Sequence, residues 1–128
     1  QKKKLIPDLI EKMKQNKNIN LTNYNLYRDY MYIDDLVSAT FKIINSFPEG
    51  YNSFTISQNK NAKILEVCEK LKVLLKSNSK IVKKKGKNNQ SVFKKKRINS
   101  SKFRKKFKWK PKFDLETGLK NLIKYEKK

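Results

Sequence analysis

The residue best suited to bind an anion is Arg28, one of three arginines in a chain that contains 30 lysines. A guanidinium forms two parallel hydrogen bonds to phosphate oxygens and stays charged at any working pH. Asp29 follows it directly, so a second interpretation is an ion pair at the end of a strand. We favour a phosphate contact at Arg28 over a purely structural ion pair.

Several other kinds of chemistry are excluded by composition. The chain has no histidine, so histidine acid/base catalysis and histidine-ligated metals are absent. Its single cysteine, Cys68, rules out a disulfide framework and a cysteine-based zinc site. Cys68 lies within an apolar stripe at helical spacing, which favours a small core thiol over a nucleophile. We therefore expect no histidine or cysteine catalyst and no metal ligand. Apolar runs are too short for a membrane span, and a lone thiol suits the reducing cytoplasm.

Two further features allow alternative interpretations. Asp34 and Asp35 resemble paired carboxylates, but adjacent acids at a helix start usually cap its free N–H groups, and we favour caps. Trp109 could stack on a base, yet its place at the end of a short helix favours packing.

The pattern of apolar residues predicts a mixed α/β fold with about five helices and three to four short strands. The face of the second helix that we expect to be buried carries Leu36, Val37, Thr40, Phe41 and Ile44. Helices are expected over 5–16, from 34 or 35 to the Pro48 region, 61–76, 100–107 and from the cap Asp114 onward. Strands are expected over 19–22, 30–33, 51–57 and 80–84.

The net charge of +22 is concentrated in the second part of the chain. Residues 76–128 carry 21 basic and 3 acidic side chains, whereas residues 1–75 carry 12 and 8. This asymmetry raises nucleic-acid binding by residues 76–128 as an alternative function. Lysine outnumbers arginine ten to one, however, which favours compositional bias over a dedicated site. We therefore do not expect nucleic acid as a partner.

Five segments follow the order and spacing of one enzyme family. They are LIPDLI at 5–10, YRDYMYIDDLV at 27–37, YNSFTI with the following ILE at 51–56 and 64–66, NSSK to WKP at 99–111, and DLETGL at 114–119. Together they resemble the NAD-dependent epimerase/dehydratases, which are extended short-chain dehydrogenase/reductases acting on nucleotide sugars. Lys108 stands where this family has a glycine after the short helix.

The resemblance implies substrate-binding roles for particular residues. In this family the arginine of the RD motif reaches the diphosphate, and Arg28 matches it. The preceding strand lines the nucleotide-base pocket, which implicates Leu21 and Thr22. A second basic residue before the short helix contacts phosphate in many members. Lys95 matches by spacing, with Lys94, Lys96 and Arg97 as alternatives.

The family's cofactor and catalytic motifs have no match in the chain. Its dinucleotide site needs a glycine-rich turn, which Gly50, Gly86 and Gly118 cannot form. Its catalytic pair is Tyr-x-x-x-Lys, and the nearest case here, Tyr24 to Arg28, ends in arginine. We therefore expect residues 1–128 to be the carboxyl-terminal substrate-binding lobe of an extended Rossmann-type enzyme, not catalytic alone.

The same resemblance implies the partners of the chain. The Rossmann half, with NAD or NADP, would lie outside these residues. The expected ligand is a nucleotide-diphosphate sugar, and the intact enzyme is expected to pair with a second copy. An inactive truncated remnant is a further alternative.

Overall fold

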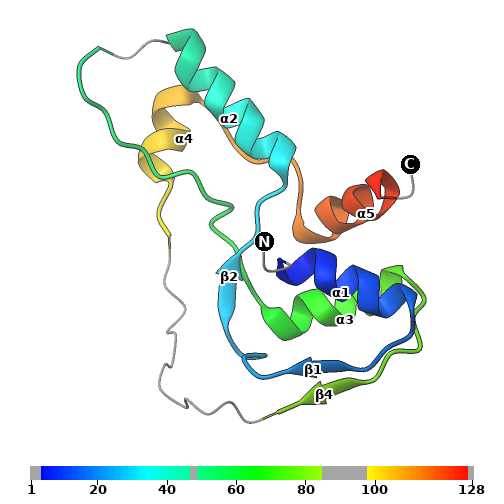
Figure 1. Ribbon diagram of the computed structural model, residues 1–128. Coiled ribbons are helices and arrows are strands. Elements are labelled where there is room, and N and C mark those ends of the chain that lie inside the picture. Colours follow the sequence, from blue (N-terminus) through cyan, green and yellow to red (C-terminus); the bar gives the residue numbers. More distant parts are fainter. Residues whose placement is uncertain (1–3, 47–48, 85–97, 127–128) are drawn as a thin grey trace.

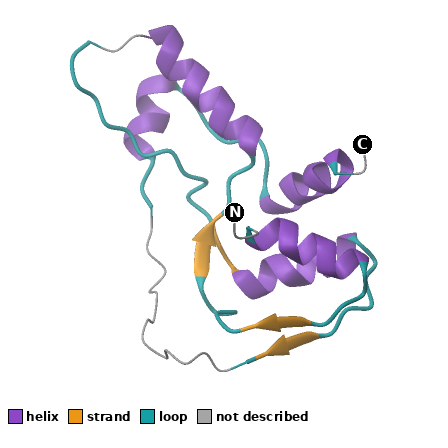
Figure 2. Ribbon diagram, in the orientation of Figure 1, coloured by secondary structure: helices purple, strands orange, loops and turns teal. Residues whose placement is uncertain are grey.

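The computed structural model describes residues 4–46, 49–84 and 98–126, which form helices and short strands in a mixed α/β arrangement (Figures 1 and 2). No helix in these ranges is long and apolar enough to cross a membrane. The helices are α1 (Leu5–Lys14), α2 (Ile33–Ser46), α3 (Ile64–Leu74), α4 (Ser101–Phe107) and α5 (Leu115–Tyr125). The strands are β1 (Ile19–Leu21), β2 (Tyr27–Asp29), β3 (Asn61–Lys63) and β4 (Ile81–Lys83).

The main core lies where α1, α3 and α5 pack together above β1 and β4 (Figure 1). Each helix presents apolar residues three or four positions apart, so one stripe of each faces the same interior. Full burial of a leucine, isoleucine, valine or methionine side chain stabilises the fold by about 1.5–3 kcal/mol relative to leaving it exposed. The fully buried members include Leu9, Ile10, Met13, Val67, Cys68 and Leu71.

The four strands form two separate two-stranded sheets. β1 and β4 run parallel, with Ile19 opposite Ile81. β2 and β3 run antiparallel, with Arg28 opposite Ala62. α3 begins directly after β3, and the Glu66 carboxylate accepts the backbone N–H of Lys63 at 2.7 Å. This ladder therefore fixes β2 to the start of a core helix.

A second, smaller core joins α2 to α4 at the other end of the molecule (Figure 1). Phe103 and Phe107 lie 4.7 Å apart between ring centroids, and Phe54 meets Phe107 edge-on at 5.1 Å. Trp109 is buried beside Phe103, and its Nε1 donates to the Ser38 hydroxyl at 2.8 Å. The expected packing role of Trp109 is confirmed.

The strands around β2 and β3 differ from the sequence-based expectation. β2 covers 27–29 instead of 30–33, and β3 occupies the place expected for the first turn of a helix. Residues 51–57 form no strand, although Phe54 and Ile56 are half-buried and Thr55 is exposed. The alternation is present without a ladder, because a strand needs a neighbouring strand to pair with and none lies beside it in the described ranges.

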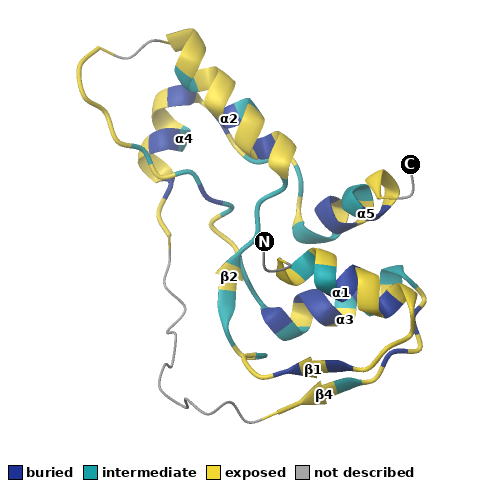
Figure 3. Cartoon of the chain, in the orientation of Figure 1, coloured by how far each residue is buried: buried dark blue, intermediate teal, exposed yellow. Residues whose placement is uncertain are grey.

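Our prediction of which face of α2 is buried is wrong. Leu36, Val37, Phe41 and Ile44 are between 43% and 58% exposed, and Figure 3 shows most of α2 at the surface. The helix buries Ala39 and Asp35 instead. An apolar stripe indicates which face seeks a partner, but the partner is supplied by other parts of the fold.

Asp35 is not the helix cap that we expected. Its carboxylate is 1% exposed and accepts the backbone N–H groups of Lys112 at 2.7 Å and Phe113 at 3.1 Å. The acid therefore anchors the segment between α4 and α5 to α2. Tyr32 supports the same junction, with its ring 4.8 Å from that of Phe113.

Candidate functional site

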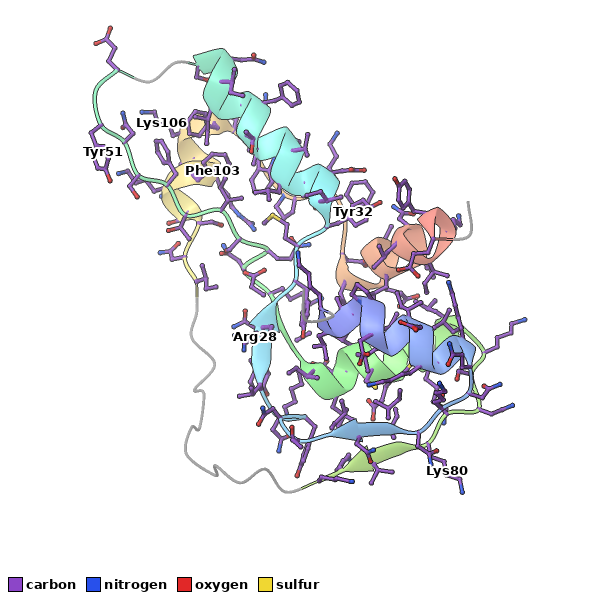
Figure 4. All side chains as sticks on the ribbon, in the orientation of Figure 1. Arg28, Tyr32, Tyr51, Lys80, Phe103 and Lys106 are labelled. Carbon is purple, nitrogen blue, oxygen red and sulfur yellow. The ribbon has the colours of Figure 1, made fainter. Side chains whose placement is uncertain are left out.

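Arg28 lies in the middle of β2, with an exposed side chain. Figure 4 shows it projecting from the outer side of the strand, away from α1 and α3. Among the described residues it forms no ion pair, while Asp29 is used elsewhere and accepts the backbone N–H of Gln58 at 3.0 Å. The strand therefore presents a guanidinium that its neighbouring acid does not neutralise by direct contact.

The positive charge of Arg28 affects the pKa of the nearby Tyr30 phenol. Burial raises the pKa of the Tyr30 phenol, and the positive charge of Arg28 acts in the opposite direction. The Tyr30 hydroxyl is buried and has no hydrogen-bond partner within the described ranges. A phenol is neutral at physiological pH, and burial disfavours its charged form further, so Tyr30 offers no negative charge to Arg28.

The other predicted substrate-binding residues have different environments. Leu21 is 6% exposed and belongs to the main core, whereas Thr22 at the end of β1 is exposed. The Leu21 carbonyl accepts the backbone N–H of Lys84 at 2.9 Å. The side chain of Leu21 is thus part of the core and its carbonyl is already bonded, which leaves the exposed side chain of Thr22 at that strand end. Lys95 and its alternatives Lys94, Lys96 and Arg97 lie outside the described residues.

A cavity of about 500 Å³ lies between β3 and the start of α5, and Arg28 does not line it. Each of its three acids already has a partner. Glu116 lies 3.3 Å from Lys70 and 2.7 Å from Lys120, the Asp114 carboxylate accepts the Thr117 N–H at 2.8 Å, and the Glu66 carboxylate accepts the Lys63 N–H at 2.7 Å. The contacts of Asp114 and Glu116 lower the pKa of both carboxyl groups, which favours their charged forms. The cavity is also lined by Lys60 and Lys112, and the Arg28 side chain is not part of it.

The described residues do not fit a dinucleotide site. Gly118 lies inside α5, where an added Cβ would lie 3.3 Å from the Cβ of Tyr32, so it serves packing. Gly50 has φ +68° in the segment after α2, with no following helix for a pyrophosphate to approach. Groups of three or more acidic, cysteine or histidine side chains that could hold a metal ion are also absent from the described part.

Comparison with known proteins decides the family. The family model described as GDP-mannose 4,6 dehydratase matches residues 1–122. This chain belongs to that family. The family resemblance predicted from five short motifs is thereby confirmed.

Known proteins that this chain resembles match most of it but are much longer. CDP-abequose synthase of Salmonella muenchen is 40% identical over 79 residues, which is 61% of this chain and 27% of that protein. UDP-glucose 4-epimerase of Thermotoga maritima, solved with UDP-glucose, has a TM-score of 0.82 at 24% identity. It matches 99% of this chain and 40% of its own length. dTDP-glucose 4,6-dehydratase of Bacillus anthracis, solved with NAD, has a TM-score of 0.71 at 26% identity over 97% of this chain and 39% of its own.

These matches confirm the predicted fold class. The mixed α/β arrangement corresponds to part of a Rossmann-type epimerase or dehydratase, and the chain spans well under half of the enzymes it resembles.

Proposed function

We propose that this chain is the nucleotide-sugar-binding portion of an NAD(P)-dependent sugar epimerase, dehydratase or reductase of the cytoplasm. The observation that carries the proposal is Arg28: within a chain that the family model matches over residues 1–122, the arginine of the RD motif is exposed. Among the described residues no carboxylate is paired with it.

Arg28 would bind the diphosphate of the substrate through two charge-assisted hydrogen bonds. The planar guanidinium matches the spacing of two phosphate oxygens, whereas lysine offers a point charge. Lys95 or a neighbour would supply a second cation, and Thr22 with the backbone of Leu21 would border the nucleotide base. The role of these residues is to hold the diphosphate and to orient the sugar.

The cofactor and the catalytic tyrosine–lysine pair would come from an amino-terminal Rossmann part. NAD or NADP would supply hydride transfer at the sugar ring. Two features of the described structure support a missing packing partner. The apolar stripe of α2 is exposed, and residues 51–57 alternate like a strand without pairing.

Binding of nucleoside diphosphates tests the proposal directly. In the full-length protein, Arg28→Ala should weaken binding of UDP, GDP or CDP, whichever binds the unmodified protein, by about 1.5–3 kcal/mol, the value of a hydrogen bond to a charged group. This corresponds to roughly 10- to 150-fold in Kd, measurable by isothermal titration calorimetry. Lys124→Ala removes an exposed cation from α5 and should leave Kd unchanged. Equal affinity of Arg28→Ala and the unmodified protein would remove Arg28 from the site.

A further inference from the structure

Arg104 on α4 is a second arginine whose side chain is half-buried. Its Nε donates to the Ser100 hydroxyl at 3.0 Å, and its Nη2 donates to the carbonyl oxygens of Ser57 at 3.1 Å and Gln58 at 3.0 Å. These three partners are neutral oxygens. The guanidinium is therefore used to hold the backbone of 57–58 against the first turn of α4.

Gln58 is held from several sides and connects Arg104 to β2. Its carbonyl accepts from Arg104, while its own N–H donates to the Asp29 carboxylate at 3.0 Å. Its side-chain amide donates to the Phe113 carbonyl. A continuous series of hydrogen bonds thus runs from α4 through one residue to the acid next to Arg28.

The turn at 57–59 is fixed by further contacts. Asn59 has φ +58°, a left-handed conformation that asparagine tolerates better than most residues. Its side-chain oxygen accepts from the Ser57 hydroxyl at 2.6 Å and from the Ser100 N–H at 3.2 Å. The carbonyls that Arg104 binds therefore belong to a rigid turn, which can transmit a positional constraint.

The position of Arg28 depends on its backbone, because no side-chain partner within the described residues holds its guanidinium. β2 has three residues and pairs with one strand of equal length. A ladder this short gives few constraints, so the bond between Asp29 and Gln58 is a substantial part of what fixes β2.

We propose that Arg104 is a positioning residue for Arg28, acting through Gln58 and Asp29. This inference rests on the proposed function, in which Arg28 binds a diphosphate. A displacement of about 1 Å at a binding group is enough to weaken an interaction that requires two aligned hydrogen bonds. Loss of Arg104 would therefore reduce diphosphate affinity although Arg104 does not touch the ligand.

The first test measures Kd by calorimetry in the full-length protein with UDP, GDP and CDP as probes. Arg104→Gln should raise Kd about tenfold, within the range of coupling between residues that share a hydrogen-bond network. Lys105→Gln removes the same charge from an exposed position of the same helix and should leave Kd within about twofold, as surface substitutions usually do. Arg104→Lys is the milder variant and should raise Kd about threefold, because a single ammonium group replaces a guanidinium that donates three hydrogen bonds.

The second test separates positioning from general stability by a double-mutant cycle. In the Arg28→Ala background, Arg104→Gln should cause no further rise in Kd, because the residue it positions is gone. The inference is overturned if Arg104→Gln raises Kd by the same factor in the unmodified protein and in the Arg28→Ala variant. It is also overturned if Kd is unchanged in both Arg104 variants while Arg28→Ala weakens binding. If Arg28→Ala itself has no effect, the proposed function fails and the inference with it.

Discussion

Lys108, the residue after α4, has φ +44° and ψ +42°, the left-handed conformation that ends many helices. For a residue with a Cβ this conformation costs roughly 1–2 kcal/mol, whereas glycine adopts it freely. The family pattern that the chain resembles has a glycine at this position, so Lys108 departs from it where the backbone is left-handed. The lysine provides no contact in the described structure that repays the cost.

Replacing Lys108 by glycine should therefore stabilise the protein. Part of the gain is offset by the greater freedom of glycine in the unfolded chain, so we expect about 1 kcal/mol in urea denaturation. Lys105→Gly inside α4 is the matched control and should destabilise by about 1 kcal/mol. Loss of stability in Lys108→Gly would show that the left-handed conformation is not adopted in solution.

At the scale of elements, local patterns predicted the helices better than the strands. α1 and α3 follow their apolar spacing to within two or three residues at each end, and α5 begins directly after its expected cap, because such patterns are local properties. β2 and β3 were misplaced because a strand is defined by its partner across the sheet. The anchoring roles of Asp35 and Arg104 were not predicted, because both bind backbone groups far along the chain and no sequence spacing records such contacts.

The cap of α5 gives an element-scale prediction that depends on pH. The Asp114 carboxylate accepts the Thr117 N–H, and this hydrogen bond lowers the pKa of Asp114 below its usual value. The charged form is thus favoured by folding, so its contribution is complete above the unfolded pKa and is lost as pH falls through the lower, folded value.

Asp114→Ala should therefore reduce the stability of the protein by about 1 kcal/mol at pH 7. The difference between variant and parent should shrink as pH falls below about 4, near the ordinary aspartate pKa. Urea denaturation at pH 7 and pH 3 measures both values. Asp114→Asn keeps an acceptor and should retain most of the stability without the pH dependence. A difference that is the same at both pH values would mean that the charge of Asp114 has no part in the cap.

At the scale of the whole molecule, the important feature is the exposed apolar stripe on α2. Five apolar residues repeat along one face of α2 and are exposed: Ile33, Leu36, Val37, Phe41 and Ile44. A stripe of this regularity is typical of a helix that packs against another element. The chain spans 40% of the length of the epimerase that it resembles, so the proposed amino-terminal part is the natural covering partner.

Phe41→Lys should consequently improve the behaviour of the isolated 128-residue chain and destabilise the full-length protein. In the isolated 128-residue chain, it removes exposed apolar surface and should reduce aggregation and binding of the dye ANS. In the full-length protein, it would place a charge in a packed interface and should lower the melting temperature by several degrees, the effect of about 1–3 kcal/mol. Val73→Lys is the control, since Val73 is 75% exposed on α3, and it should leave the full-length melting temperature unchanged. If Phe41→Lys also leaves that melting temperature unchanged, α2 does not pack against the amino-terminal part. The stripe would then need another partner, and the proposal that residues 1–128 form a lobe completed by a Rossmann half would lose the stronger of its two supporting structural features.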